Sequence, residues 1–177
     1  KEKYGDARRT RVVRQAAGSI SLEDMIPDEE SMLVYTKGGY IKRTNPGEYR
    51  QQNRGGVGVV DLDTKEEDFI TLFMSATTHS DLLFFSDKGK AYQIKMYDIP
   101  EGRRATKGKS IMNFLSLSGD EKVTSILPMP KAVKASPISL FLVTKNGTAK
   151  KMSGESFKDV RRSGIISIRL DKGDELA

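Results

Sequence analysis

The sequence has no cysteine and a single histidine in 177 residues. Without cysteine there is no disulfide framework and no thiolate metal site, and a reducing compartment is favoured. His79 has no second histidine or cysteine to share a metal ion, so we interpret it as a loop or core residue. No Ser–His–Asp set or pair of catalytic carboxylates stands out. The sequence therefore predicts no catalytic residue, no metal site and no cofactor.

Long apolar runs and helical periodicity are also missing. No segment approaches the ~20 apolar residues of a transmembrane helix, and no signal-peptide core opens the chain. We therefore expect no membrane contact. No segment keeps a 3.6-residue apolar period, so helix should be minor. Lys and Arg number 30 against 24 Asp and Glu, a net charge of +6. This balance favours an acidic partner such as nucleic acid.

One phrase, a β-prone run, a glycine turn and a second β-prone run, recurs three times. The glycine between the two runs predicts a tight primed hairpin turn. The turn glycines are Gly39, Gly89 and Gly147, with steps of 50 and 58 residues. The paired runs are 32–36 with 40–44, 82–86 with 90–94, and 140–144 with 148–152. Residues 82–85 are all apolar, which predicts burial on both faces.

A basic, glycine-bearing loop follows each hairpin, then a predicted strand and an acidic turn. The loops contain residues 54–56, 103–108 and 161–164, the strands 57–62, 111–117 and 165–170, and the acidic turns 66–68, 120–121 and 174–175. Further strands are expected at 20–26, 69–74 and 123–127. This period is typical of propeller blades. We predict an all-β, propeller-like array of four-stranded blades, about three in number.

Residues 1–18 are polar and basic, and we interpret them as a linker from a preceding domain. Residues 19–177 would then form the blades, in units of roughly 19–65, 66–119 and 120–173. The chain reads as a fragment of a longer protein. Its outer blades should expose side chains such as Leu33 and Tyr35, or Leu140 and Leu142, and so favour self-association.

The basic residues fall at equivalent places in the three units, whereas the acidic turns are expected at the other end of each blade. Such a pattern predicts a basic rim that contacts phosphates. The candidate contacts are Lys42, Arg43, Arg50, Arg54, Lys88, Lys90, Lys95, Arg103, Arg104, Lys107, Lys109, Lys145, Lys150, Lys151, Arg161 and Arg162.

Two glycine-rich stretches need separate interpretation. Residues 102–110 resemble a P-loop, but five residues instead of four separate the glycines and no helical pattern follows, so nucleotide binding is not favoured. Residues 52–58, Gln-Asn-Arg-Gly-Gly-Val-Gly, are either a phosphate-contacting loop or a plain glycine turn.

The chain resembles the family of DNA gyrase A C-terminal domains, which belong to a bacterial type II topoisomerase, over essentially its whole length. The segments that carry the resemblance are 4–10, 22–26, 38–43, 48–49, 52–58, 67–70, 78–79 and 147–151. The resemblance implies a β-pinwheel of about six blades, of which this chain would be the first half. It also implies a basic rim that bends and wraps duplex DNA.

Within this resemblance, residues 52–58 correspond to the family's gyrase A box, Q-R-R-G-G-K-G. Asn53 and Val57 replace two of its cations, whereas Gln52, Arg54, Gly55, Gly56 and Gly58 remain and join the candidate DNA contacts. The loss of two charges puts the electrostatic part of the box in doubt.

The resemblance also implies a role in a larger enzyme. The fragment would be non-catalytic, and the active-site tyrosine would lie in an N-terminal core of gyrase A that is absent here. With that core and the gyrase B protein, ATP and Mg²⁺ would drive negative supercoiling in the bacterial cytoplasm, at the nucleoid. Two alternatives stay open, the equivalent domain of topoisomerase IV and a β-propeller scaffold for protein interactions.

Overall fold

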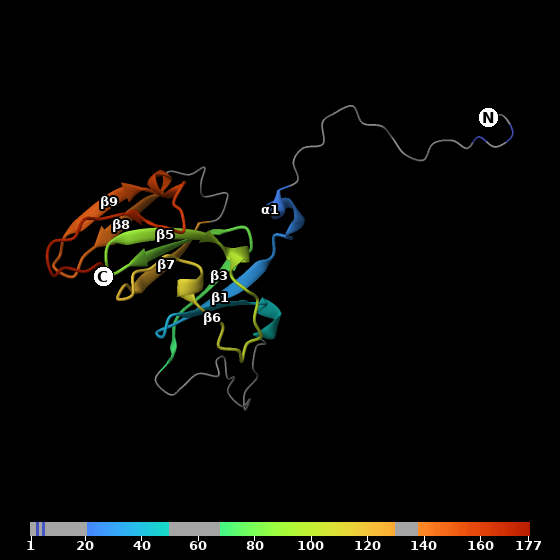
Figure 1. Cartoon of the computed structure of the whole chain (residues 1–177), viewed down its shortest axis with the longest axis horizontal. Coiled ribbons are helices and arrows are strands. Elements are labelled where there is room, and N and C mark those ends of the chain that lie inside the picture. The colour runs from blue at the N-terminus through green and yellow to red at the C-terminus, as the bar shows by residue number, and fades with distance from the viewer. Residues whose placement is uncertain (1–2, 4, 6–20, 50–67, 130–137) are drawn as a thin grey trace.

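The computed structural model describes residues 3, 5, 21–49, 68–129 and 138–177. In these residues the chain forms three antiparallel sheets, with sheet B packed between sheets A and C (Figure 1). Helix in this described part is confined to single turns. The all-β prediction is confirmed.

Within residues 21–49, 68–129 and 138–177, sheets A and B have four strands each, and sheet C has two. Sheet A has the order β3-β1-β2-β6, sheet B the order β10-β5-β4-β7, and sheet C pairs β8 with β9. The strand bounds are β1 (Glu30–Thr36), β2 (Tyr40–Thr44), β3 (Ile70–Thr77), β4 (Asp81–Ser86), β5 (Lys90–Lys95), β6 (Lys109–Ser110), β7 (Val123–Met129), β8 (Ser139–Val143), β9 (Ala149–Ser153) and β10 (Ile165–Ile166).

The three predicted hairpins are present, as β1–β2, β4–β5 and β8–β9. Their turns, however, are not of the primed type. Primed turns need a positive φ at the first central residue, but only the last glycine of each turn has one, at +78° for Gly39, +70° for Gly89 and +91° for Gly147. Each turn is therefore a normal turn followed by a left-handed glycine. A threonine or serine hydroxyl at the start of each turn accepts a hydrogen bond from the N–H four residues later.

Three predicted strand regions differ from the prediction over most of their length. Residues 22–25 form the short helix α1 (Leu22–Met25), because Ser21 and Asp24 make a reciprocal capping box at its start. Most of 111–117 is also not extended. It opens with the 3₁₀ turn η3 (Ile111–Asn113), which points Ile111 and Leu115, four residues apart, into the same core. Of 165–170 only β10 is a strand. The remaining turns are η1 (Pro46–Glu48), η2 (Met96–Asp98) and η5 (Gly154–Phe157).

The sheets do not coincide with the sequence units. Strand β6 directly follows the basic loop 103–108 of the second unit but pairs with β2 of the first. In the same way, β10 from the third unit pairs with β5 of the second. Each complete sheet is thus closed by a short strand from the unit that follows it. The predicted boundaries at 65/66 and 119/120 describe the repeat in the sequence, and as domain limits they stay a prediction.

Two apolar cores hold the sheets together. One lies between sheets A and B and contains Leu33, Ile41, Leu82 and Phe84, whereas the other lies between sheets B and C and contains Leu83 and Phe85. Residues 82–85 are therefore buried on both faces, as predicted, with exposures of 0–4%.

The prediction that Leu33, Tyr35, Leu140 and Leu142 lie on the open outer faces is wrong. Leu33 is 0% exposed, Tyr35 8% and Leu142 6%, because these side chains point into the two cores, and Leu140 packs against the second. Successive side chains on a strand point to opposite faces. The open face of sheet C is accordingly formed by the alternate residues Phe141 and Val143, 69% and 47% exposed.

Candidate nucleic-acid interface

Two basic loops, 103–108 and 161–164, lie against the sheet of the preceding unit. A glycine makes each close approach possible. Gly108 has a φ of +84°, and a Cβ there would stand 2.5 Å from the carbonyl oxygen of Ile41. Gly164 has a φ of +78°, and its Cβ would stand 2.5 Å from the ring of Tyr92. Only glycine fits either position without a shift of the neighbouring strand.

Lys42, on β2, supports the first loop from inside. Its side chain is 1% exposed. Its ammonium donates to the carbonyl oxygen of Arg103 at 3.4 Å and also to that of Arg104. A buried ammonium that is satisfied by backbone carbonyls does not reach a phosphate on the surface. Lys42 therefore leaves the set of candidate contacts and becomes a support of the loop.

Other cations near this loop are also engaged with the protein. The Arg43 Nε donates to the Ile99 carbonyl at 3.0 Å, and its Nη1 lies 3.7 Å from Glu101. The backbone N–H of Arg104 donates to the Glu48 carboxylate at 2.7 Å, and the Arg104 guanidinium donates through Nη1 to the Glu48 carbonyl at 3.3 Å. Glu48 therefore anchors this loop. Because it is an acid, the pattern of basic residues in the sequence gives no signal for it.

The side chain of Lys107 lies over the ring of Tyr40, with Nζ 3.7 Å from the ring centroid. Its position is thereby held by a cation–π contact. The Lys107 ammonium is partly exposed and remains a candidate contact.

The acidic turns lie beside the hairpin turns, not at the other end of the blades. The Gly38 N–H donates to Asp68 at 2.7 Å, and the Asn146 N–H donates to Asp174 at 3.0 Å. Lys88 accordingly lies 3.5 Å from Asp120, and Lys145 2.5 Å from Glu175. The predicted separation of acids and bases is wrong here because contacts about 30 residues apart bring the two turns together.

Glu121 is the most deeply embedded of these acids, with a side chain that is 0% exposed. Burial alone would raise the pKa of its carboxyl group. Hydrogen bonds from the Ser86 and Tyr92 hydroxyls, the Ser118 N–H and the Lys90 ammonium favour the charged form more strongly and lower the pKa to about 2. Lys90, 3.2 Å from Glu121, thus serves a buried carboxylate.

Lys95 is held in a similar way at the opposite end of the same hairpin. Its ammonium lies 2.9 Å from the buried Asp81 and 3.8 Å from Glu23 of α1. It therefore links α1 to sheet B, and a DNA phosphate would have to compete with these two carboxylates for the ammonium.

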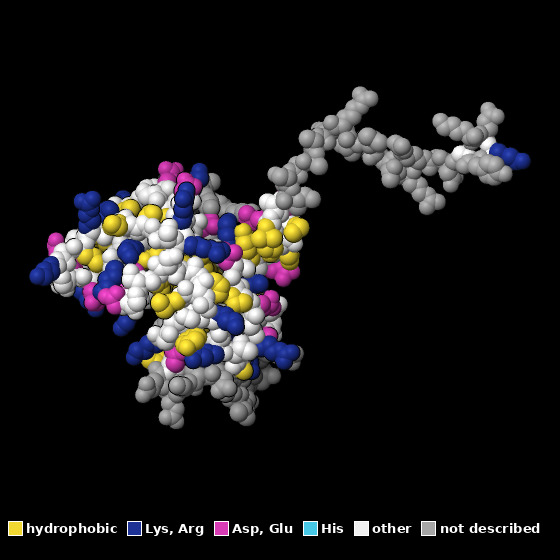
Figure 2. All heavy atoms as spheres, viewed as in Figure 1, with side chains coloured by type: hydrophobic (Ala, Val, Ile, Leu, Met, Phe, Trp, Pro, Cys, Tyr) yellow, Lys and Arg dark blue, Asp and Glu magenta, His cyan; other side chains and the backbone are white. Residues whose placement is uncertain are grey.

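Several candidates are exposed and pair with no acidic side chain in the described part of the chain. They are Arg103, Lys109, Lys150, Lys151 and Arg161. The Lys150 ammonium donates to the Ser167 carbonyl at 2.7 Å, and Lys151 lies over the ring of Phe141. Arg162 is 58% exposed and lies 2.8 Å from Asp98. Figure 2 shows lysine and arginine side chains distributed along the outline of the molecule, with acidic side chains among them.

Part of the predicted set lies outside the described residues. This part consists of Arg50, Gln52, Arg54, Gly55, Gly56 and Gly58. Lys158 and Arg169 are exposed on the third unit and were not among the predicted contacts. Their only signal in the sequence is their position next to a basic loop.

Neither a metal cluster nor a membrane span was found among the described residues. No group of three or more His, Asp or Glu side chains there is placed to hold a metal ion. No helix in that part is long and apolar enough to cross a membrane.

A family model for the DNA gyrase C-terminal domain, a β-propeller, matches residues 30–76, 80–128 and 139–177. The DNA gyrase A protein of Clostridium acetobutylicum is 40% identical over 176 residues, which is 99% of this chain and 21% of that protein. The DNA gyrase A protein of Escherichia coli K12 is 39% identical over 173 residues, 98% of this chain and 19% of that protein. The chain thus spans about a fifth of the length of these curated relatives.

Solved structures agree in fold. The C-terminal domain of a DNA topoisomerase IV superposes with a TM-score of 0.70 at 25% identity, covering 86% of this chain and 45% of that one. A DNA gyrase A C-terminal domain superposes with a TM-score of 0.66 at 28% identity, covering 84% and 46%.

Proposed function

The chain belongs to the DNA gyrase C-terminal domain family, and on that premise we propose that it binds duplex DNA and bends it along its basic loops. The binding is electrostatic and reads the backbone, because no base-reading code is evident beside the cations in the described part of the chain. The chain itself carries out no chemical step.

One observation supports this proposal above the others. The two described basic loops expose Arg103 and Arg161, and neither guanidinium is paired with an acid among the described residues. Both loops are attached in the same way, by a short strand and a left-handed glycine, to the preceding sheet. Unpaired cations at related places on successive sheets suit a curved phosphate backbone that passes from one sheet to the next.

We further propose that the chain works within DNA gyrase, together with an N-terminal core of gyrase A and with the gyrase B protein. DNA held in a bend of fixed hand would let the enzyme use ATP hydrolysis to introduce negative supercoils. Residues 52–58 would then be a loop of the same kind as the two described ones. Replacing Gly55 and Gly56 by alanine in full-length gyrase A should abolish supercoiling and leave relaxation intact.

The test is the salt dependence of DNA binding. Each phosphate contact contributes about 0.9 to the slope of log K against log salt concentration. Replacing both Arg103 and Arg161 by alanine should lower the slope by about 1.8. The matched control replaces Lys88 and Lys145, which already pair with acids, and should lower it far less. Undetectable binding at low salt, or equal effects of the two double variants, would refute the proposal.

The alternatives give different results in these experiments. A protein-interaction scaffold would show no salt-dependent DNA affinity. The topoisomerase IV alternative would leave supercoiling absent even in the unmodified full-length protein, because that enzyme's box is degraded or missing. The intact Arg54, Gly55, Gly56 and Gly58 favour gyrase.

A further inference from the structure

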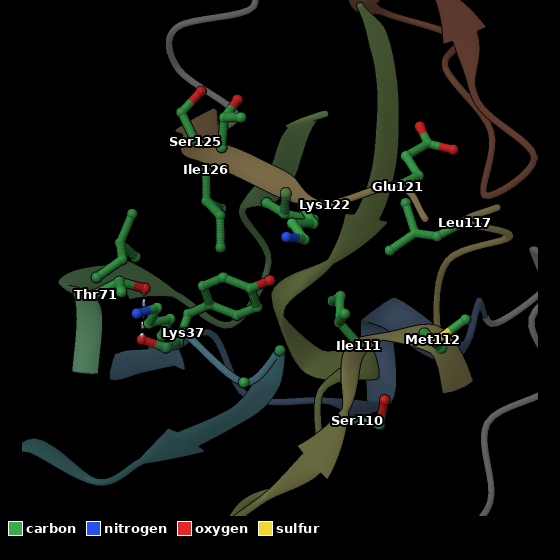
Figure 3. Close-up of a pocket in the computed structure, with 16 residues that line it drawn as sticks. Lys37, Thr71, Ser110, Ile111, Met112, Leu117, Glu121, Lys122, Ser125 and Ile126 are labelled. Carbon is green, nitrogen blue, oxygen red and sulfur yellow. Dashed lines mark hydrogen bonds between the residues drawn. The ribbon is translucent and has the colours of Figure 1, made fainter. Parts of the chain in front are cut away.

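A cavity of about 440 Å³ lies between sheets A and B, where the β1–β2 turn faces β7 and η3 (Figure 3). None of the predicted DNA contacts is among the residues that line it. Its volume falls within the range of small-molecule sites, ~300–1,000 Å³. The walls are mostly apolar, with Leu72, Ile111, Leu117 and Ile126 among the lining side chains.

A tyrosine hydroxyl at this cavity has no hydrogen-bond partner among the described residues. Tyr35 lines the cavity and is 8% exposed, yet its hydroxyl makes no hydrogen bond in that part of the chain. The oxygen is not one of the buried polar atoms that lack a partner, so it is accessible from the cavity. Burial of the side chain and the negative charge of Asp68 raise the pKa of Tyr35, so the hydroxyl keeps its proton and can donate it. A ligand in the cavity that carries an acceptor could therefore bind to this hydroxyl.

The charges around the cavity favour a negative ligand. The ammonium of Lys122 points into the space (Figure 3), and Lys37 lies on another wall, above the ring of Phe69. Among the described residues, the only acid that lines the cavity is Glu121, and its carboxylate points away from it and is already bound by Lys90 and Tyr92. An anion there would gain two ammonium groups, whereas the nearby Asp68 carboxylate, which also acts on Tyr35, already accepts from the Thr36 hydroxyl and the Gly38 N–H.

We propose that this cavity binds a small amphipathic anion, a molecule with a flat apolar body and one carboxylate, sulfonate or phosphate group. The body packs against the apolar walls, and the anionic group accepts from the Lys122 ammonium and the Tyr35 hydroxyl. Because the cavity is lined by both sheets, such a ligand contacts sheets A and B at once. This site is independent of the proposed DNA contacts.

The test uses anilinonaphthalene sulfonate, which is an aryl sulfonate whose fluorescence rises on binding, with the whole chain. Lys122→Met keeps the length of the side chain and removes its charge, and should weaken binding about tenfold, the loss of one charge-assisted contact. Tyr35→Phe removes only the hydroxyl and should weaken binding about threefold. Lys172→Met is the matched control, since Lys172 is exposed and does not line the cavity.

A second probe separates this site from exposed apolar surface such as Phe141. Phenylnaphthylamine has the same rings without the sulfonate, and its weaker binding should be insensitive to Lys122→Met. If the sulfonate binds both cavity variants as tightly as the control, or if the two probes respond alike to Lys122→Met, the proposal is wrong. Thermal unfolding of each variant checks that the fold is retained. We expect Lys122→Met to keep the fold, because Lys122 is exposed.

Discussion

Replacing Lys42 by methionine tests whether this residue supports the proposed DNA-binding loop or contacts a phosphate directly. Lys42 is buried, and its ammonium donates to the carbonyl oxygens of Arg103 and Arg104. Methionine has a similar length but no donor. We expect the loop to lose its position, and both arginines to lose their placement relative to the DNA.

The size of the effect distinguishes the possibilities. A lysine that contacts one phosphate contributes about 0.9 to the salt slope, which corresponds to ~8-fold in affinity at 0.1 M salt. If Lys42 positions both arginines, the slope falls by up to about 1.8 and the affinity by up to ~60-fold at the same salt. Hydrogen bonds to a charged group contribute ~1.5–3 kcal/mol each, so the free energy of unfolding should also fall by a few kcal/mol at most.

Fluorescence anisotropy with a labelled duplex over a range of salt concentrations measures the slope, and urea unfolding measures stability. The same substitution in a variant that already lacks the Arg103 and Arg104 side chains should change the slope no further, because coupled residues are not additive. If Lys42→Met lowers the slope by the same amount in both backgrounds, then Lys42 contacts a phosphate itself and the loop-support role is refuted.

Three further predictions concern stability and association. Gly108→Ala should destabilise the fold by more than ~1 kcal/mol in urea, because it adds a Cβ 2.5 Å from the Ile41 carbonyl to an unfavourable φ. Gly147→Ala, with a φ of +91° and open space around it, should cost less. The pKa of Glu121 is lowered from an ordinary 4.5 to about 2, so its ionised carboxylate stabilises the fold above pH 4.5 and this stabilisation is lost as the pH falls towards 2. The free energy of unfolding should fall by about 3 kcal/mol over this pH range, and in acid unfolding measurements this fall should be absent from Glu121→Gln. Phe141→Lys should reduce any self-association seen by light scattering, since Phe141 is 69% exposed on the open face of sheet C.

The hairpins could be predicted because their information is local. Two β-prone runs and the glycine turn between them lie within about a dozen residues, and all three hairpins form where this pattern occurs. The turn type was predicted wrongly because a glycine shows that φ is free, not which turn residue uses a positive φ. The hydroxyl of Thr36, Ser86 or Thr144, which closes each turn, was a local signal that went unused.

The pairing of distant segments could not be predicted from the sequence. Strands β6 and β10 have two residues each, too few to show a period, and they pair with strands more than 60 residues away in the chain. The burial of Lys42 depends on one of these pairings, because the loop that covers it arrives with β6. A lysine in a strand otherwise indicates a position that faces solvent, so the sequence predicted Lys42 as a surface contact and not as a buried support of the loop.

The exchange of strands has a consequence for how the cations are placed. Arg103 belongs to the second sequence unit, yet its loop is fixed to sheet A by β6, by the ammonium of Lys42 and by Glu48. Arg161 is fixed to sheet B in the corresponding way through β10. The distance between these two arginines is therefore set by the packing of sheet A on sheet B, not by the length of the chain between them. We infer that DNA held by both loops takes its curvature from that packing, so a substitution in the core that changes the angle between the sheets should alter DNA bending while leaving every cation in place.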